Sequence, residues 1–176
     1  MTKLSVRYPV TSTFLEKESF RSDAHLGIDF AMPKNTELRS IADGVIDNIV
    51  YSPTLGKGVY VKWPDGKTAI YGHMNEGSVE VGDKVEIGDL IGYSGNTGNV
   101  VGENDGYHLH FALKDENGAF IDPEPYSLYI QEMNHELIDI MQGVNQPDDN
   151  SFHQLMNELI EVFEEVEPAI QCIPAF

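Results

Sequence analysis

The sequence has 176 residues, of which 41% are hydrophobic and 23% are charged, which predicts one ordinary globular domain with room for a hydrophobic core. Its net charge of −18 argues against nucleic acid and anionic membrane surfaces as partners, and no stretch is long and apolar enough to span a bilayer. The single cysteine, Cys172, excludes an intrachain disulfide and a cysteine-rich zinc site.

The first predicted element is a strand over residues 24–30 (AHLGIDF) that carries its polar residues on one face. Successive side chains of a strand point to opposite sides. His25, Gly27 and Asp29 therefore share one face, while the other face is apolar. Gly27, between the two polar residues, has no side chain and leaves their face open.

Alternating apolar residues predict further strands, which are separated by glycine-containing turns. These segments span residues 44–52, 58–74, 78–95 and 107–122. PDG at 64–66 and ENG at 116–118 lie where hairpin turns are expected. Together the segments predict a mainly β protein with a compact antiparallel β-sheet domain over residues 1–126.

Three further histidines lie on these predicted strands. His73 comes near the end of one segment, and His108 and His110 flank a single leucine in the run YHLHF, so that they share a face. Two imidazoles on one face are costly in a core but natural around a metal or in a catalytic cleft. Each motif alone is more typical of an ordinary surface strand. Their combination with His25 and Asp29 favours a common site.

These four histidines and one aspartate form a set that suits zinc. Zinc accepts imidazole nitrogen and carboxylate oxygen, and a catalytic zinc keeps a fourth position for water. Three members of the set would bind the metal, and the remaining two would transfer protons and stabilise charge. The other two histidines, His135 and His153, are expected at solvated positions of a helical tail.

Beyond Tyr126 the hydrophobic period changes from that of strands to that of helices. Residues 130–144 and 152–166 place apolar side chains at the i, i+3, i+4, i+7 spacing. Residues 127–176 hold ten acidic residues and no Lys or Arg. We therefore expect an acidic C-terminal α-helical hairpin over residues 127–176. It would either cap the β body or, through residues 127–170, mediate homo-oligomerisation or docking to a larger particle.

Taken in order, the motifs resemble a known family. HxxxD at 25–29, Tyr-Gly-His at 71–73, VEVGDKVEIGDLIGYSGNTG at 79–98 and HLHF at 108–111 are similar to those of the lysostaphin-type (LytM-like) zinc endopeptidases, over about residues 20–126. The resemblance implies that zinc is held by His25, Asp29 and His110. It implies that His108 and His73 are catalytic, with His108 as the base and His73 as a donor to the oxyanion, or with these roles exchanged.

The same resemblance implies the substrate and the place of action. The substrate would be a peptide bond in the stem or cross-bridge of peptidoglycan, at the bacterial cell wall outside the cytoplasm. The N-terminal run MTKLSVRYPVTSTF has no signal-peptide core. We therefore expect another route to the wall, such as delivery as a phage lysin or as a virion-associated hydrolase.

Two other functions compete with this interpretation. A catalytically silent member of the same family would act as a binding, scaffold or regulatory protein, but such a member would lack one or more ligands, and all five positions are filled here. The run VEVGDKVEIGDLIG also resembles the hairpin of biotinyl- or lipoyl-type carrier domains. A carrier needs a lysine at the turn tip in an MKM or DKA context, and neither occurs, so this alternative is rejected.

Overall fold

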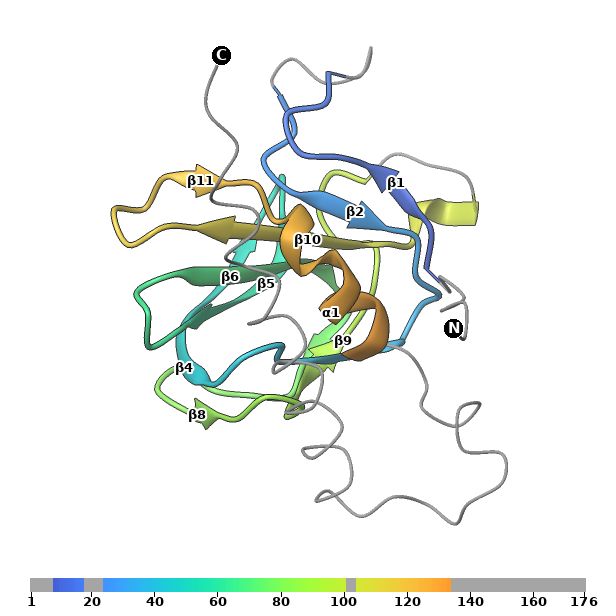
Figure 1. The fold of residues 1–176 in the computed structure, drawn as a ribbon. Helices are drawn as coiled ribbons and strands as arrows, with labels where there is room; N and C mark the ends of the chain where they lie inside the picture. Colours follow the sequence, from blue (N-terminus) through green and yellow to red (C-terminus); the bar gives the residue numbers. More distant parts are fainter. Residues whose placement is uncertain (1–7, 18–23, 101–103, 134–176) are drawn as a thin grey trace, which may run out of the picture. The chain divides into compact units, whose positions relative to one another are not determined.

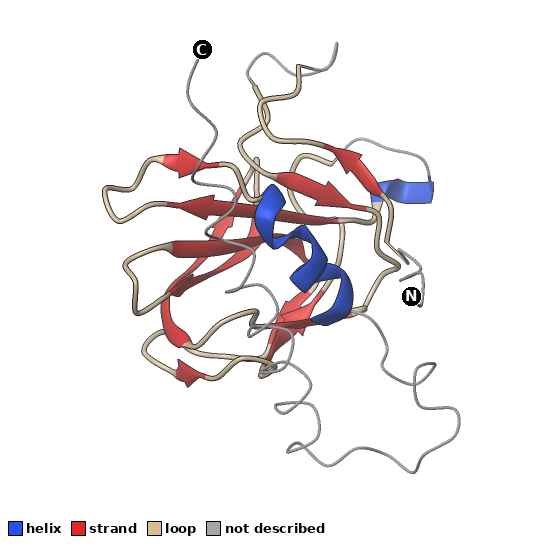
Figure 2. Cartoon of the chain, viewed as in Figure 1, coloured by secondary structure: helices blue, strands red, loops and turns tan. Residues whose placement is uncertain are grey.

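The computed structural model describes residues 8–17, 24–100 and 104–133, which fold mainly as antiparallel β-strands (Figures 1 and 2). The mainly β fold class expected from the sequence is therefore confirmed. None of the helices in these ranges has the length and apolar character needed to cross a membrane.

The larger sheet brings together strands that are far apart in the sequence. Its order is β1-β2-β10-β6-β5-β4-β8, and β11 also pairs with β10. The bounds are Val10–Ser12 (β1), Ile28–Phe30 (β2), Gly44–Ser52 (β4), Gly56–Lys62 (β5), Thr68–Met74 (β6), Lys84–Val85 (β8), Leu109–Lys114 (β10) and Phe120–Ile121 (β11). Every neighbouring pair is antiparallel. The HxxxD and HxH segments thereby become neighbours through β2 and β10.

A second sheet places β9 (Leu90–Tyr93) between β3 (Glu37–Arg39) and β7 (Glu76–Gly77). The segment 78–95, expected as strand, contributes only β8 and β9. Gly82 and Gly88 interrupt it with φ angles of +95° and +92°. Glycine is the residue that adopts such angles without steric cost, so both act as turn residues.

The core lies along β6 and β10 because both strands are paired on each side. All residues of β6 are buried. The rings of Tyr71 and Phe111, a cross-strand pair, meet edge to face with centroids 5.3 Å apart. Leu109 and Phe111 are both fully buried. The apolar face of HLHF therefore anchors β10 in the core, which fixes the direction of the histidines on its other face.

Helix α1 (Ser127–Met133) follows the short 3₁₀ helix η2 (Glu124–Tyr126), and another 3₁₀ turn, η1, spans Asn104–Gly106. Ile130 of α1 is fully buried. The side chain of Gln131 binds the backbone of Tyr8: its Nε2 donates to the Tyr8 carbonyl at 2.6 Å, and its Oε1 accepts from the Tyr8 N–H at 3.1 Å. Helix α1 is thus part of the body formed by the β-strands.

Among the described residues, helix α1 continues the compact unit past residue 126. Most of the expected helical hairpin, residues 134–176, lies outside the described residues. The hairpin and the domain boundary at residue 126 therefore remain predictions.

Candidate metal centre and active site

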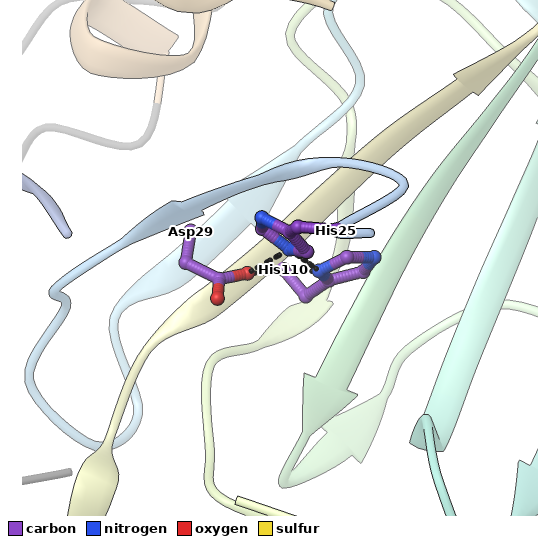
Figure 3. Close-up of side chains that lie close together, drawn as sticks. All are labelled: His25, Asp29 and His110. Atoms are coloured by element: carbon purple, nitrogen blue, oxygen red, sulfur yellow. Dashed lines mark hydrogen bonds and ion pairs between the residues drawn. The ribbon is translucent and has the colours of Figure 1, made fainter. Parts of the chain in front are cut away.

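Three side chains bring one ligating atom each to a common point (Figure 3). His25 Nε2 lies 3.1 Å from Asp29 Oδ1 and 3.0 Å from His110 Nδ1. His110 Nδ1 lies 2.8 Å from Asp29 Oδ1. This is the set that the family resemblance implies as zinc ligands, and the fold brings all three together.

The sheet accounts for two of the three positions. Asp29 lies in β2 and His110 in β10, and the antiparallel register places these two residues directly opposite each other. Side chains of such a pair lie on the same face with their Cβ atoms about 5 Å apart. His25 comes from the irregular chain just before β2. A cross-strand pair and a neighbouring loop therefore build the cluster.

Gly27, between His25 and Asp29, makes room for the third side chain. A Cβ atom at residue 27 would lie 2.6 Å from Cε1 of His110 and 2.6 Å from the carbonyl oxygen of Phe111. Real Cβ atoms do not approach other atoms so closely. The open face inferred from the sequence is therefore filled by the ring of His110.

Hydrogen bonds fix which nitrogen of His25 faces the cluster. Its Nδ1 lies 3.0 Å from the carbonyl oxygen of Thr13 and 2.9 Å from Ser12 Oγ. A carbonyl oxygen only accepts, so Nδ1 carries the proton of the neutral ring and Nε2 carries a lone pair. This is the arrangement that a metal-binding histidine adopts.

The protonation states of the other two residues also suit a cation. Burial alone would raise the pKa of Asp29, but the hydrogen bond from His110 and the close approach of the His25 ring outweigh it and hold the pKa well below its usual range. Burial lowers the pKa of His110, although its bond to Asp29 opposes this. The cluster therefore offers Asp29 as a carboxylate and favours the neutral imidazole of His110, the states in which these groups bind metals.

The size of the cluster fits zinc. Ligands about 2.0–2.2 Å from a tetrahedral zinc ion lie about 3.3–3.6 Å from one another. The three atoms lie 2.8–3.1 Å apart, so small movements would seat the ion. At most one proton, the one on His110 Nδ1, lies between the three ligating atoms. A bound cation would take the place of that proton.

Two further histidines lie beside this cluster. The rings of His73 and His108 have centroids 4.6 Å apart, and the centroid of His73 lies 5.7 Å from that of His110. His108 Nε2 lies 3.8 Å from Asp29 Oδ1, and this buried nitrogen has no hydrogen-bond partner among the described residues. An unpartnered buried nitrogen aimed at the cluster is unusual in a merely structural histidine.

Both rings present the same nitrogen to the site. His73 Nδ1 donates to the carbonyl of Thr97 at 2.8 Å, and His108 Nδ1 donates to the carbonyl of Gly106 at 2.7 Å. Their Nε2 atoms therefore carry lone pairs when the rings are neutral. Burial is the main cause that lowers the pKa of His73 to about 4, so this ring is neutral at neutral pH.

The backbone of His73 is held in a conformation that is uncommon outside glycine. Its φ is +57°, at the end of β6. Such strain in a non-glycine residue concentrates at functional sites. Thr97 stabilises this bend: its hydroxyl donates to the Met74 carbonyl at 2.8 Å and accepts from the Lys57 N–H at 2.9 Å.

The sequence did not point to the groups that orient these rings. Three of them are backbone carbonyls, of Thr13, Thr97 and Gly106, and a carbonyl is present in every residue, so it leaves no signal in the pattern. His135 and His153, expected at solvated positions, lie outside the described residues.

Comparisons with known proteins agree with this geometry. A family model described as Peptidase family M23 matches residues 23–123. The peptidoglycan DD-endopeptidase ShyA of Vibrio cholerae is 35% identical over 117 residues, which cover 61% of this chain and 26% of ShyA. The chain spans only about a quarter of the length of the curated relatives it matches first.

Solved structures with the same fold include LytU and lysostaphin. LytU is 33% identical with a TM-score of 0.62, covering 72% of this chain and 88% of that one. The catalytic domain of the antimicrobial peptidase lysostaphin from Staphylococcus simulans is 28% identical with a TM-score of 0.59, covering 68% of this chain and 91% of that one.

Proposed function

The chain belongs to peptidase family M23, and from this premise we propose that it is a zinc-dependent endopeptidase that cleaves a peptide bond in the stem or cross-bridge of peptidoglycan. The observation that carries the proposal is the convergence of His25, Asp29 and His110 beside two further histidines with lone pairs directed into the site. A DD-endopeptidase among the relatives supports the class of substrate.

In the proposed mechanism His25 Nε2, Asp29 Oδ1 and His110 Nδ1 hold the zinc ion. When bound, zinc polarises the scissile carbonyl and lowers the pKa of the attacking water from ~15.7 towards ~7. His108 Nε2 takes the proton of that water and passes it to the nitrogen of the leaving amine. Loss of such a base typically lowers the rate by ~10²–10⁴-fold.

For His73 we propose a role other than donation to the oxyanion. Its Nδ1–H donates to Thr97, so its Nε2 accepts a hydrogen bond and can donate to an oxyanion only after protonation. Burial lowers the pKa of His73 to about 4, which makes that protonation unfavourable at neutral pH. We therefore assign His73 Nε2 to orient the attacking water, and His108 to act as the base.

The competing proposal is a catalytically silent scaffold or regulatory protein of the same family. The five filled positions and the unpartnered Nε2 of His108 support an enzyme instead. The proposal includes action at the bacterial cell wall, delivery by a phage or virion, and docking through residues 127–170. Which bond is cut depends on substrate contacts outside the metal cluster.

One experiment tests the metal and the reaction together. The purified protein should contain about one zinc per chain and should release new amino groups from purified peptidoglycan sacculi. A chelator should abolish this release, and added zinc should restore it. Protein that binds zinc but releases no amine from sacculi of several cross-bridge types would favour the scaffold. Protein that binds no zinc would refute the proposed chemistry.

A further inference from the structure

His25 is the one ligating residue of the cluster that no strand holds. Asp29 and His110 are fixed by the pairing of β2 with β10, whereas His25 lies in irregular chain. Its side chain is nevertheless almost completely buried, with 4% of its surface exposed. Contacts from another part of the chain must therefore hold its ring in place.

Those contacts come from the N-terminal segment. The backbone of His25 is held by two hydrogen bonds, from its own N–H to the Glu16 carbonyl at 3.1 Å and from the Leu15 N–H to its carbonyl at 2.7 Å. The ring Nδ1 lies within hydrogen-bond distance of the Thr13 carbonyl and of Ser12 Oγ. Backbone and ring are thus both held by residues 12–16.

The carboxylate of Glu16 closes the turn that presents the Thr13 carbonyl. It accepts the Thr13 N–H at 2.7 Å and the Thr13 hydroxyl at 3.2 Å, while the Glu16 N–H donates to the Thr13 carbonyl at 3.2 Å. Leu15 within this turn has a φ of +61°, a conformation that is unfavourable for leucine. The turn is therefore held against local strain, as is typical of a segment that serves a site.

The same segment also contacts the second ligand. Ser12 of β1 pairs with Asp29 of β2, and the Thr11 hydroxyl donates to the Asp29 carbonyl at 3.3 Å. These residues precede the region 23–123 that matches the family model. The family match alone would therefore not assign them to the site.

We propose that Ser12 and Glu16 are positioning residues of the zinc site, which orient His25 Nε2 towards Asp29 and His110. Ser12 Oγ binds the His25 ring directly, and Glu16 fixes the Thr13 carbonyl that receives the ring's N–H. This proposal rests on the proposed zinc site. Partners that orient a metal-binding histidine typically contribute ~10–100-fold to metal affinity.

The test is zinc affinity of the full chain, measured by competition with a chromogenic chelator. Ser12→Ala and Glu16→Ala should each weaken zinc binding roughly tenfold. Glu16→Gln should recover much of the loss, because an amide oxygen still accepts from Thr13. Ser78→Ala, which removes an exposed hydroxyl elsewhere, is the matched control and should bind zinc like the wild type.

Thermal unfolding with and without zinc separates positioning from general stability. A positioning role predicts that Ser12→Ala shrinks the rise in Tm that zinc produces. A merely structural role would lower Tm by the same amount with and without zinc. That result, together with an unchanged zinc affinity, would overturn the proposal. If the wild type itself binds no zinc, the proposed function fails and this proposal fails with it. If the wild type binds zinc, and Ser12→Ala and Glu16→Ala bind it as tightly as Ser78→Ala does, this proposal alone fails.

Discussion

Replacing Gly27 by alanine should push His110 away from the other two ligating atoms. The added Cβ would lie 2.6 Å from Cε1 and 2.9 Å from Nε2 of the His110 ring, and 2.6 Å from the carbonyl oxygen of Phe111. Non-bonded carbon atoms are ordinarily about 3.5 Å or more apart. The ring, or strand β10 itself, must therefore move by roughly 0.5–1 Å.

This movement is large compared with what a metal site tolerates. Ligand distances in a good site stay within about 0.2 Å of their preferred values. We therefore expect Gly27→Ala to weaken zinc binding roughly tenfold or more. Overpacking of a buried position also typically costs about 1–3 kcal/mol of folding free energy. The zinc-free protein should consequently unfold at lower denaturant concentration than the wild type.

The assay is chelator competition combined with urea unfolding of the zinc-free protein. Gly77→Ala is the matched control, because a Cβ at residue 77 would meet only Val59 Cγ2, at 3.8 Å. That variant should stay within about 0.5 kcal/mol of the wild type. If Gly27→Ala binds zinc as tightly as Gly77→Ala, His110 does not occupy the position described here and the reasoning is refuted.

Other predictions address the ligands, the buried histidine and the helix. His110→Ala should lose zinc, whereas His108→Ala should keep zinc and lose activity by ~10²–10⁴-fold. If His108→Ala loses zinc and His110→Ala keeps it, His108 is the ligand and the assignment is wrong. Burial lowers the pKa of His73 to about 4, so the unfolded chain protonates first as pH falls. Stability of the zinc-free protein should drop by about 3 kcal/mol from pH 6.5 to 4 in urea titrations, and an equally steep drop in His73→Gln would contradict this. Truncation after Tyr126 removes α1 and should lower Tm. A chain ending at Glu136 should keep the wild-type Tm and zinc content. Equal Tm values for the two truncated chains would show that α1 adds no stability.

The sequence by itself determined the mainly β fold class, and it singled out the five residues of the proposed site. Alternation of polar and apolar residues depends only on the two-residue period of a strand, so it could be read without knowing what each strand pairs with. It placed Leu109 and Phe111 on the face that the structure buries, and it left His110 on the other face. The order of the motifs then led to the peptidase family.

Only the tertiary structure decided how these residues meet. The pairing of His110 with Asp29 depends on β2 lying next to β10, a long-range choice made by core packing. The Thr97 hydroxyl stabilises His73 at φ +57°, and the tautomers of the His73 and His25 rings depend on the carbonyls of Thr97 and Thr13. A carbonyl belongs to the backbone of every residue, so its role arises from position in space. Local sequence patterns carry no information about such positions, and this is why the groups that orient the histidines emerged only from the fold.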